Sequence, residues 1–415
     1  MTGAGEPTAA PPAGLYVHIP FCVSLCPYCD FVVYAGAAAR GPRNRIDLFL
    51  TALEAEIGLR ADALDERWGA AGTPGRPALE TVYFGGGTPS LLPAAAIGRL
   101  LSIIRERFGL APEAEVTLEA NPGPDERGDA AALVASGINR LSLGAQSLDP
   151  TELKRLGRRH KRVHVGEAVA EARRAGMSSV SLDLLYDVPG GTLATWIKTL
   201  DAALALGPDH LSLYALTLDD PVAEGLTGPM GDHLPTTRGA RGWRVAAVID
   251  QDEDRAAAQY HHAAHRLAED GWHGYEISNW ARPGHESRHN LGYWERRPYE
   301  AVGPGAHAFD GATRRWNAAR FEPYLAALAP AHGGPPTVPP GGIEVLDRAT
   351  AEVEALILGL RTDRGIESDA ATRAPLLDEF GWALAAELLT VTDEGRIVLT
   401  TRGRLLSNEL FARLV

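Results

Sequence analysis

Three cysteines near the N-terminus form the densest group of reactive side chains in this sequence. Cys22, Cys26 and Cys29 follow the spacing C-x-x-x-C-x-x-C and are the only cysteines among 415 residues. A closed zinc site normally takes four protein ligands, whereas a cubane iron–sulfur cluster can be held by three thiolates and keep one iron open. We expect an iron–sulfur cluster with an open position, and a zinc site completed by His18 is the alternative.

Composition narrows the classes of function. The net charge is −13, whereas proteins that bind nucleic acid usually present a basic surface, so we expect no nucleic-acid partner. No run of about 18 apolar residues is available to span a membrane, and residues 1–14 lack the charged start and apolar core of a signal peptide. We therefore expect a cytoplasmic protein whose thiols stay reduced and free to bind metal.

Apolar runs alternate with amphipathic helical patterns over the first half of the chain. Helical periodicity covers residues 47–68, 94–108 and 163–175, among others. This alternation requires parallel strands joined by right-handed crossovers, in an open doubly wound sheet or in a complete or partial barrel. The six predicted strands are residues 15–19, 79–84, 115–120, 140–144, 180–185 and 210–216.

Polar or glycine-rich groups follow each of these predicted strands. Because the carboxyl ends of parallel strands meet at one edge of a sheet, the groups should share one rim. The glycines at 85–87 would let a ligand approach the backbone closely, and Arg158 could clamp a carboxylate. Taken singly, each residue is also explained by a turn, a helix cap or a solvated face. The predicted rim comprises the cysteine loop, Gly85, Gly86, Gly87, Thr88, Glu119, Asn121, Gln146, Asp183, Asp187, Tyr214 and Ala215.

The rest of the chain divides where its composition changes. Residues 1–13 are expected to be a disordered leader to a barrel domain over 14–218. A connecting region follows at 219–328 and begins with a flexible insertion at 219–242. A linker rich in Pro and Gly at 329–342 precedes the last segment, 343–415.

The last segment has its own pattern of elements. A helix at 344–360, a second helix ending near 389, a hairpin at 391–400 and a closing helix from 402 predict a small α+β, winged-helix-like domain. Such domains often touch DNA. The acidic balance of the chain favours a packing or partner role instead.

Five segments together resemble the radical S-adenosylmethionine (SAM) superfamily, in which the cysteine loop follows the first strand of a partial (β/α)6 barrel. They are most similar to the branch of oxygen-independent coproporphyrinogen III oxidases and haem chaperones. The segments are YVHIPFC (16–22), YFGGGTPS (83–90), EANP (119–122), NRLSLGAQS (139–147) and DLLYDVPG (183–190). The resemblance implies that Cys22, Cys26 and Cys29 ligate a 4Fe-4S cluster whose open iron is chelated by SAM. It also implies a SAM site of Tyr16, Gly86, Gly87, Thr88, Glu119, Gln146, Arg158, Asp183 and Ala215.

Two departures separate this chain from the oxidases of that branch. The oxidases carry a further cysteine two residues after the third cluster ligand, where this chain has Phe31. They also have a longer N-terminal segment, whereas only about fifteen residues precede the first predicted strand here. Both departures disfavour oxidative decarboxylation of coproporphyrinogen III, which is the alternative function.

The segment HNLGYW (289–294) matches the H-N-x-x-Y-W haem motif of the chaperones in this branch. Imidazole is a common axial ligand of haem iron, and aromatic rings can cover a porphyrin face. Without the resemblance, a turn whose tyrosine and tryptophan pack in the core would explain the same residues. The predicted haem site is His289, Asn290, Tyr293 and Trp294, with His307 as a weaker candidate.

The sequence thus predicts a haem chaperone without oxidase activity. The chaperone would carry a 4Fe-4S cluster and SAM and would deliver haem to an apo-haemoprotein, for example a respiratory one. A metal-stabilised scaffold is the third alternative. The resemblance also allows a homodimer and peripheral contact with a membrane-bound acceptor, although no basic amphipathic helix argues for membrane binding.

Overall fold

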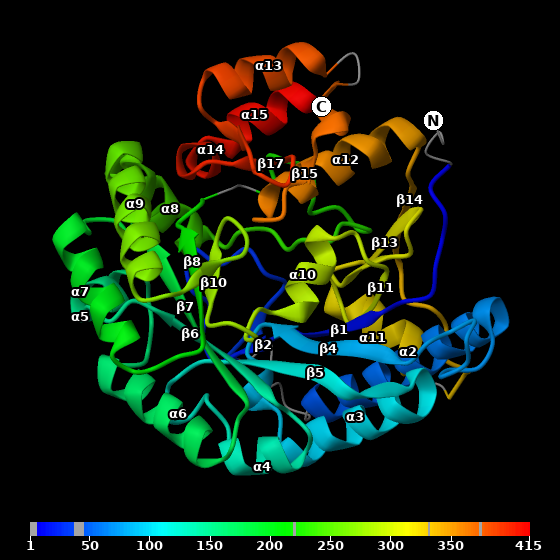
Figure 1. Cartoon of the computed structure of the whole chain (residues 1–415). Coiled ribbons are helices and arrows are strands. Elements are labelled where there is room, and N and C mark those ends of the chain that lie inside the picture. Colours follow the sequence, from blue (N-terminus) through cyan, green and yellow to red (C-terminus); the bar gives the residue numbers. More distant parts are fainter. Residues whose placement is uncertain (1–5, 37–44, 219–220, 331–332, 373–375) are drawn as a thin grey trace.

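A curved sheet with helices along its outer side forms the main body of the molecule (Figure 1). The structure is a computed structural model and describes residues 6–36, 45–218, 221–330, 333–372 and 376–415. The six predicted parallel strands lie side by side in chain order and form the predicted partial barrel. They are β1 (Gly14–Ile19), β4 (Leu79–Gly86), β5 (Leu110–Ala120), β6 (Arg140–Gln146), β7 (Ser179–Tyr186) and β8 (His210–Ala215).

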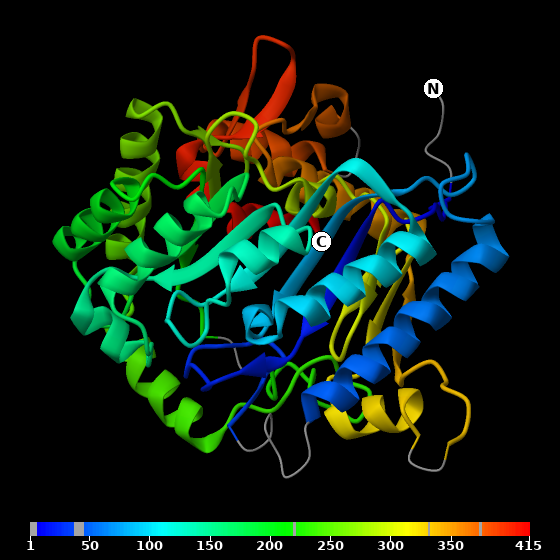
Figure 2. The same cartoon turned by 90° about the horizontal axis from the view of Figure 1, so that it is seen from below.

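The helices that connect these strands form an arc around the sheet, which is also visible from below (Figure 2). They bury one apolar side each, as Leu53 and Ile57 show in the first long helix. Asp and Thr side chains cap the N-termini of several of them. The helices are α2 (Arg45–Trp68), α3 (Ala94–Phe108), α4 (Ala130–Ala135), α5 (Pro150–Arg155), α6 (Arg162–Arg174) and α7 (Leu193–Leu204), with a 3-10 turn at Pro89–Leu91.

The sheet is larger than predicted, because the region expected to be a connection adds strands to both of its edges. On one side, β10 (Asn279–Ala281) pairs antiparallel with β8 and then with β9 (His273–Gly274). On the other side, β11 (Tyr299–Val302) pairs parallel with β1. The sheet continues beyond it through β12 (His307–Phe309), β13 (Thr313–Asn317) and β14 (Gly341–Val345).

The structure corrects two predicted boundaries, one through strand β14 and one through helix α8. Strand β14 occupies the end of the expected linker and the start of the expected helix at 344, and the helix α12 begins only at Arg348. In the expected insertion at 219–242, helix α8 (Arg238–Asp250) begins behind a Thr237 cap. Residues 219–220 and 331–332 lie outside the described residues. Helices α9 (Glu253–Glu269) and α11 (Phe321–Leu328) complete this part of the chain.

The expectation of a disordered leader is wrong for residues 6–13. The backbone N–H of Ala10 donates to Asp310 O over 2.7 Å, and that of Ala13 donates to Pro298 O over 2.8 Å. The carbonyl of Ala13 in turn accepts from Glu80 N. Backbone bonds to segments far along the chain, which a single sequence does not reveal, therefore order this stretch. Residues 1–5 lie outside the described residues.

The C-terminal part forms a small α+β module around its own core, which includes Leu360, Phe380 and Leu410. Its three strands have the order β15-β17-β16, and the predicted hairpin is confirmed as β16 and β17. Its elements are α12 (Arg348–Arg361), β15 (Ile366–Glu367), a 3-10 turn at Ser368–Thr372, α13 (Leu377–Ala385), β16 (Leu389–Val391), β17 (Arg396–Leu399), α14 (Thr401–Leu405) and α15 (Ser407–Leu414).

Helix α10 (Arg288–Trp294) carries the H-N-x-x-Y-W segment and lies on the inner side of the curved sheet, between β4 and the C-terminal module (Figure 1). An ion pair between Arg296 and Glu354 joins the residues just after α10 to α12. The described helices include none that combines the length and the apolar content needed to cross a membrane.

Candidate functional site

The cysteine segment is a loop that starts in β2 (Phe21–Cys22), which pairs with β3 (Tyr34–Ala35). Its three thiols are half-buried. Cys22 Sγ lies 3.4 Å from Thr88 Oγ1, and Arg158 Nη1 donates to Cys26 Sγ over 3.4 Å. The loop therefore presents its sulfurs to the glycine-rich turn on one side and to a guanidinium on the other.

The protonation of these thiols bears on what they can hold. Burial raises the pKa of Cys22 to about 11 and the pKa of Cys29 to about 12. Without metal, Cys22 and Cys29 are therefore protonated at neutral pH, and iron binding releases their protons. Within the described part of the chain, no three His, Cys, Asp or Glu side chains form a preformed metal cage. Three soft sulfur donors on one loop nevertheless fit an iron–sulfur cluster.

His18 is poorly placed to complete a zinc site. Its Nε2 is hydrogen-bonded to Val32 O over 2.8 Å, and its Nδ1 to the hydroxyl of Tyr16 over 3.0 Å. Burial lowers the pKa of His18 to about 4, so the ring is neutral and both of its nitrogens are occupied. The zinc alternative thus lacks its fourth ligand in this arrangement.

The glycine-rich turn after β4 is bonded directly to the start of the cysteine loop. Gly87 N donates to Ile19 O over 2.8 Å, and Thr88 N donates to Phe21 O over 2.7 Å. A Cβ atom on Gly87 would lie 2.6 Å from Phe21 O, so only glycine allows this approach. The two predicted motifs therefore form one structural unit.

Glu119, at the end of β5, faces this turn. Its Oε2 accepts from Gly86 N over 2.9 Å, and its Oε1 accepts from the hydroxyl of Tyr83 over 2.8 Å. Burial, helped by the nearby charge of Asp183, raises the pKa of Glu119 to about 7. A carboxylate held in this way can accept a hydrogen bond from an amine or a ribose hydroxyl of a ligand.

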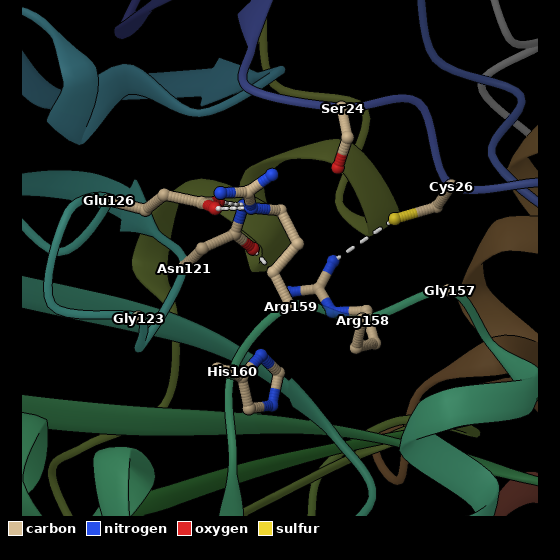
Figure 3. A pocket seen from close by; sticks show the side chains of 9 residues that line it. All are labelled: Ser24, Cys26, Asn121, Gly123, Glu126, Gly157, Arg158, Arg159 and His160. Atoms are coloured by element: carbon tan, nitrogen blue, oxygen red, sulfur yellow. Dashed lines mark hydrogen bonds and ion pairs between the residues drawn. The ribbon is translucent and has the colours of Figure 1, made fainter.

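Arg158 lies beside a small polar pocket that reaches Cys26 (Figure 3). Its guanidinium donates to Gly144 O over 2.7 Å and to Asn121, while its buried Nε has no hydrogen-bond partner in the described structure. A buried cation with a spare donor next to an open pocket suits a carboxylate ligand. The pocket is lined by Ser24, Cys26, Asn121, Gly123, Glu126, Gly157, Arg158, Arg159 and His160.

The remaining predicted SAM residues lie at strand ends along the same sheet. Gln146 sits at an irregularity between β6 and β7 and has a φ of 66°, a strained value for this residue type. Asp183 accepts from the Ser142 hydroxyl through both oxygens over 3.1 Å. Ala215 is exposed at the end of β8.

The predicted haem ligand His289 lines a pocket together with Thr81 and Tyr293, but its ring nitrogens are both engaged within the protein. Its Nδ1 is hydrogen-bonded to Thr81 Oγ1 over 2.8 Å, and its Nε2 to the hydroxyl of Tyr293 over 2.8 Å. The side chain is 3% exposed, and burial lowers the pKa of His289 to about 3. The imidazole is therefore neutral, which a metal ligand must be, but both of its nitrogens are engaged.

The other members of the segment face different neighbours. Asn290 N is capped by Ser287 Oγ, and the guanidinium of Arg361 in α12 lies 4.5 Å from the centre of the Trp294 ring. The indole Nε1 of Trp294 is buried and lacks a partner among the described residues. His307, the weaker haem candidate, belongs to β12 and contacts a different residue. Its Nε2 lies 2.7 Å from Asp232 Oδ2.

Two residues that were not singled out from the sequence contact the predicted sites. Tyr83 contacts both Glu119 and His289, and its ring stacks on the imidazole at 5.2 Å. His160 lines the pocket beside Arg158. The alternation along β4 places Thr81 and Tyr83 on one face of the strand, but their partner His289 lies about 200 residues further along the chain.

Comparisons with known proteins agree with this geometry. Residues 16–203 match the family model described as the Radical SAM superfamily. A protein named heme chaperone HemW from Mycobacterium tuberculosis (strain ATCC 25618 / H37Rv) is 38% identical over 99% of this chain and 96% of its own length. Radical S-adenosyl methionine domain-containing protein 1, mitochondrial, from Bos taurus is 34% identical over 94% of this chain and 83% of its own length. The chain therefore belongs to the radical SAM superfamily, within the family of the heme chaperone HemW.

The solved structure of coproporphyrinogen III oxidase (HemN) from Escherichia coli matches with a TM-score of 0.77, over 98% of this chain and 90% of that one. The sequence identity is 24%, so this likeness concerns the fold. It supports the partial barrel together with the added strands and the C-terminal module.

Proposed function

We propose that the protein is a haem chaperone that binds haem at α10 and delivers it to an apo-haemoprotein. The observation that carries this proposal is the 38% identity, over nearly the whole chain, to a protein named heme chaperone HemW. The proposed haem residues are His289, Asn290, Tyr293 and Trp294. Imidazole can ligate the iron, and the aromatic rings can cover the porphyrin. We place this activity in the cytoplasm, with a respiratory haemoprotein as acceptor and no nucleic-acid partner.

The superfamily implies a 4Fe-4S cluster and SAM, and we assign Cys22, Cys26 and Cys29 to the cluster. When bound, a reduced cluster supplies the electron that can cleave the SAM sulfonium. The residues of the chain position the ligand: Gly86 and Gly87 let it reach the backbone, and Arg158 offers a cation for its carboxylate. The other proposed SAM residues are Tyr16, Thr88, Glu119, Gln146, Asp183 and Ala215.

Haem binding at His289 requires a local rearrangement. The Nε2 atom has to leave the hydroxyl of Tyr293 before it can ligate iron, because that hydrogen bond occupies its lone pair or its proton. Helix α10 has only seven residues, so such a movement involves a short segment. We call the described conformation, in which both ring nitrogens of His289 are hydrogen-bonded within the protein, the closed form of the site.

The test is a haem titration followed by the Soret absorbance, in the wild-type protein and in His289→Gln. Glutamine keeps polar contacts with Thr81 and Tyr293 but is a poor haem ligand, so the dissociation constant should rise about tenfold or more. His265→Ala, which removes an exposed histidine of α9, should bind haem like the wild type. Normal haem binding by His289→Gln, with its iron content intact, would refute this site.

The transfer step needs its own assay. Haem-loaded protein mixed with an apo-haemoprotein should lose its Soret band as the acceptor gains one. The alternative activity predicts something else: anaerobic protein reconstituted with the cluster, given SAM, reductant and coproporphyrinogen III, would form protoporphyrinogen. We expect no such product, because Phe31, 64% exposed, stands where the oxidases carry a cysteine.

A further inference from the structure

Tyr83 touches the two proposed ligand sites at once. Its hydroxyl donates to Glu119 Oε1 over 2.8 Å, while the face of its ring stacks on the imidazole of His289, with centroids 5.2 Å apart and planes at 28°. The ring of Tyr16 also stacks on Tyr83, with the two centroids 6.1 Å apart. One side chain therefore lies between Glu119, which is proposed to accept a hydrogen bond from SAM, and the proposed haem ligand His289.

Glu119 depends on Tyr83 for its orientation. Among the described residues, two groups donate hydrogen bonds to its carboxylate: the Tyr83 hydroxyl and Gly86 N. Gly86 belongs to the turn that is bonded to the cysteine loop. A shift of the Tyr83 ring would therefore release one oxygen of Glu119 and leave the carboxylate held from one side only.

His289 in turn keeps Tyr83 in place. The imidazole is fixed by Thr81 from the same strand and by Tyr293 from its own helix. If His289 turns outwards to bind haem iron, the Tyr83 ring loses the surface on which it stacks. The arrangement that holds Glu119 ready for its ligand is thus the arrangement in which His289 is unavailable.

We infer that Tyr83 is a positioning residue that couples the two sites, so that SAM and haem each weaken the binding of the other. This inference rests on the proposed function. SAM held by Glu119 favours the closed form, with Tyr83 stacked on His289, whereas haem on His289 favours the open form. Because coupling between two binding equilibria is reciprocal, both dissociation constants change by the same factor.

The experiment measures the dissociation constant for haem with and without saturating SAM, on protein reconstituted with its cluster, and that for SAM with and without haem. Couplings of this kind are typically about 5- to 150-fold. We expect saturating SAM to raise the dissociation constant for haem about fivefold or more. Haem should raise the dissociation constant for SAM by the same factor. An unchanged haem constant in wild-type protein that binds both ligands overturns the coupling. Wild-type protein that binds no haem even without SAM overturns the proposed function instead.

Tyr83→Phe isolates the coupling residue. The ring remains on His289 while the bond to Glu119 is lost, so haem binding without SAM should stay within about twofold and the coupling factor should fall towards one. Tyr260→Phe is the matched control, because the Tyr260 hydroxyl donates to Ile277 O away from both sites, and it should keep the full factor. A coupling factor that survives in Tyr83→Phe overturns the role of Tyr83.

Thr81→Val is a second test of the closed form, and it leaves both hydrogen bonds of Glu119 in place. It removes the hydrogen bond to His289 Nδ1 and should loosen the closed form, so haem binding without SAM should tighten by about fivefold. Weaker or unchanged haem binding, in a variant with wild-type iron content, would overturn the closed-form explanation.

Discussion

The cysteine loop and helix α10 differ in how available their side chains are to a ligand. On the loop, three thiols are half-buried, Cys26 lines a pocket, and the Nε atom of Arg158 in the same pocket has no partner among the described residues. On α10, His289 is almost fully buried and both ring nitrogens are bonded within the protein. A pocket also borders His289, so the two regions differ in their side chains: Arg158 has a donor that is free within the described structure, whereas the His289 nitrogens are already hydrogen-bonded. A sequence motif identifies the type of ligand atom, and the fold decides whether that atom is available.

The largest effect should come from the loop. Cys22→Ser should abolish the cluster, because three thiolates leave no redundancy, and iron, acid-labile sulfide and the visible absorbance should all be lost. Ser24→Ala, on the same loop, is the control and should retain iron. A Cys22→Ser protein with full iron content would mean that the cluster ligands lie elsewhere.

Gly87→Ala should be the next most severe change. The new Cβ would lie 2.6 Å from Phe21 O and 2.9 Å from Ile19 O, so the turn could not stay bonded to the cysteine loop. We expect a loss of about 1–3 kcal/mol in the free energy of unfolding, measured by urea denaturation. Gly239→Ala on α8 has no atom within 4 Å of the new Cβ and should cost far less. Equal stabilities of the two variants would contradict the close approach.

Arg244→Gln should loosen the cysteine loop by removing its contacts with helix α8. Arg244 of α8 donates to Pro27 O over 3.1 Å and to Cys29 O over 3.0 Å, and it pairs with Asp30. Its loss should speed the release of iron to a chelator several-fold, because two carbonyls and a carboxylate lose a charged donor. Arg241→Gln, exposed on the same helix, should release iron at the wild-type rate. If both variants behave alike, α8 does not support the loop.

The last effect is spread over a range of pH and concerns Glu119, which lies between the two regions. Its pKa rises from 4.5 to about 7 on folding, so between these values the unfolded chain loses a proton that the folded chain retains. The contribution of Glu119 to stability is therefore greatest below about pH 4.5 and declines as the pH rises to about 7. Relative to Glu119→Gln, ligand-free wild type should lose roughly 1–3 kcal/mol across this window. Urea titrations at several pH values measure the difference, and parallel pH profiles would refute the raised pKa.

The sequence predicted the central sheet because short segments in which buried leucines alternate with polar residues, as in Leu141-Ser142-Leu143 and Leu182-Asp183-Leu184, are separated by helical patterns. It could not predict β9 to β14 in the same way. These strands have two to five residues, and pairings such as Gly14 with Tyr299 join segments that lie far apart in the chain. Short edge strands leave no periodic signal of their own.

The same contrast holds for the site. The spacing of the cysteines and the glycine-rich turn carried enough information to predict that they lie on one rim. The closure of His289 depends on Thr81 and Tyr83, and nothing in the residues around 289 identifies these partners. Local patterns therefore predicted that these motifs lie together, while the contacts around His289 required the structure.

The pairing of β1 also has a consequence for the newly made chain. This first strand is bonded on one side to β4 and on the other to β11, where Val17 pairs with Val302. At a synthesis rate of roughly 5–20 residues per second, the second partner emerges tens of seconds after the first strand. During that interval one edge of β1, next to the cysteine loop, has no neighbouring strand. An unpaired edge is prone to association with other chains, so completion of the sheet, rather than its initiation, should be the step at which a nascent molecule is most vulnerable to aggregation.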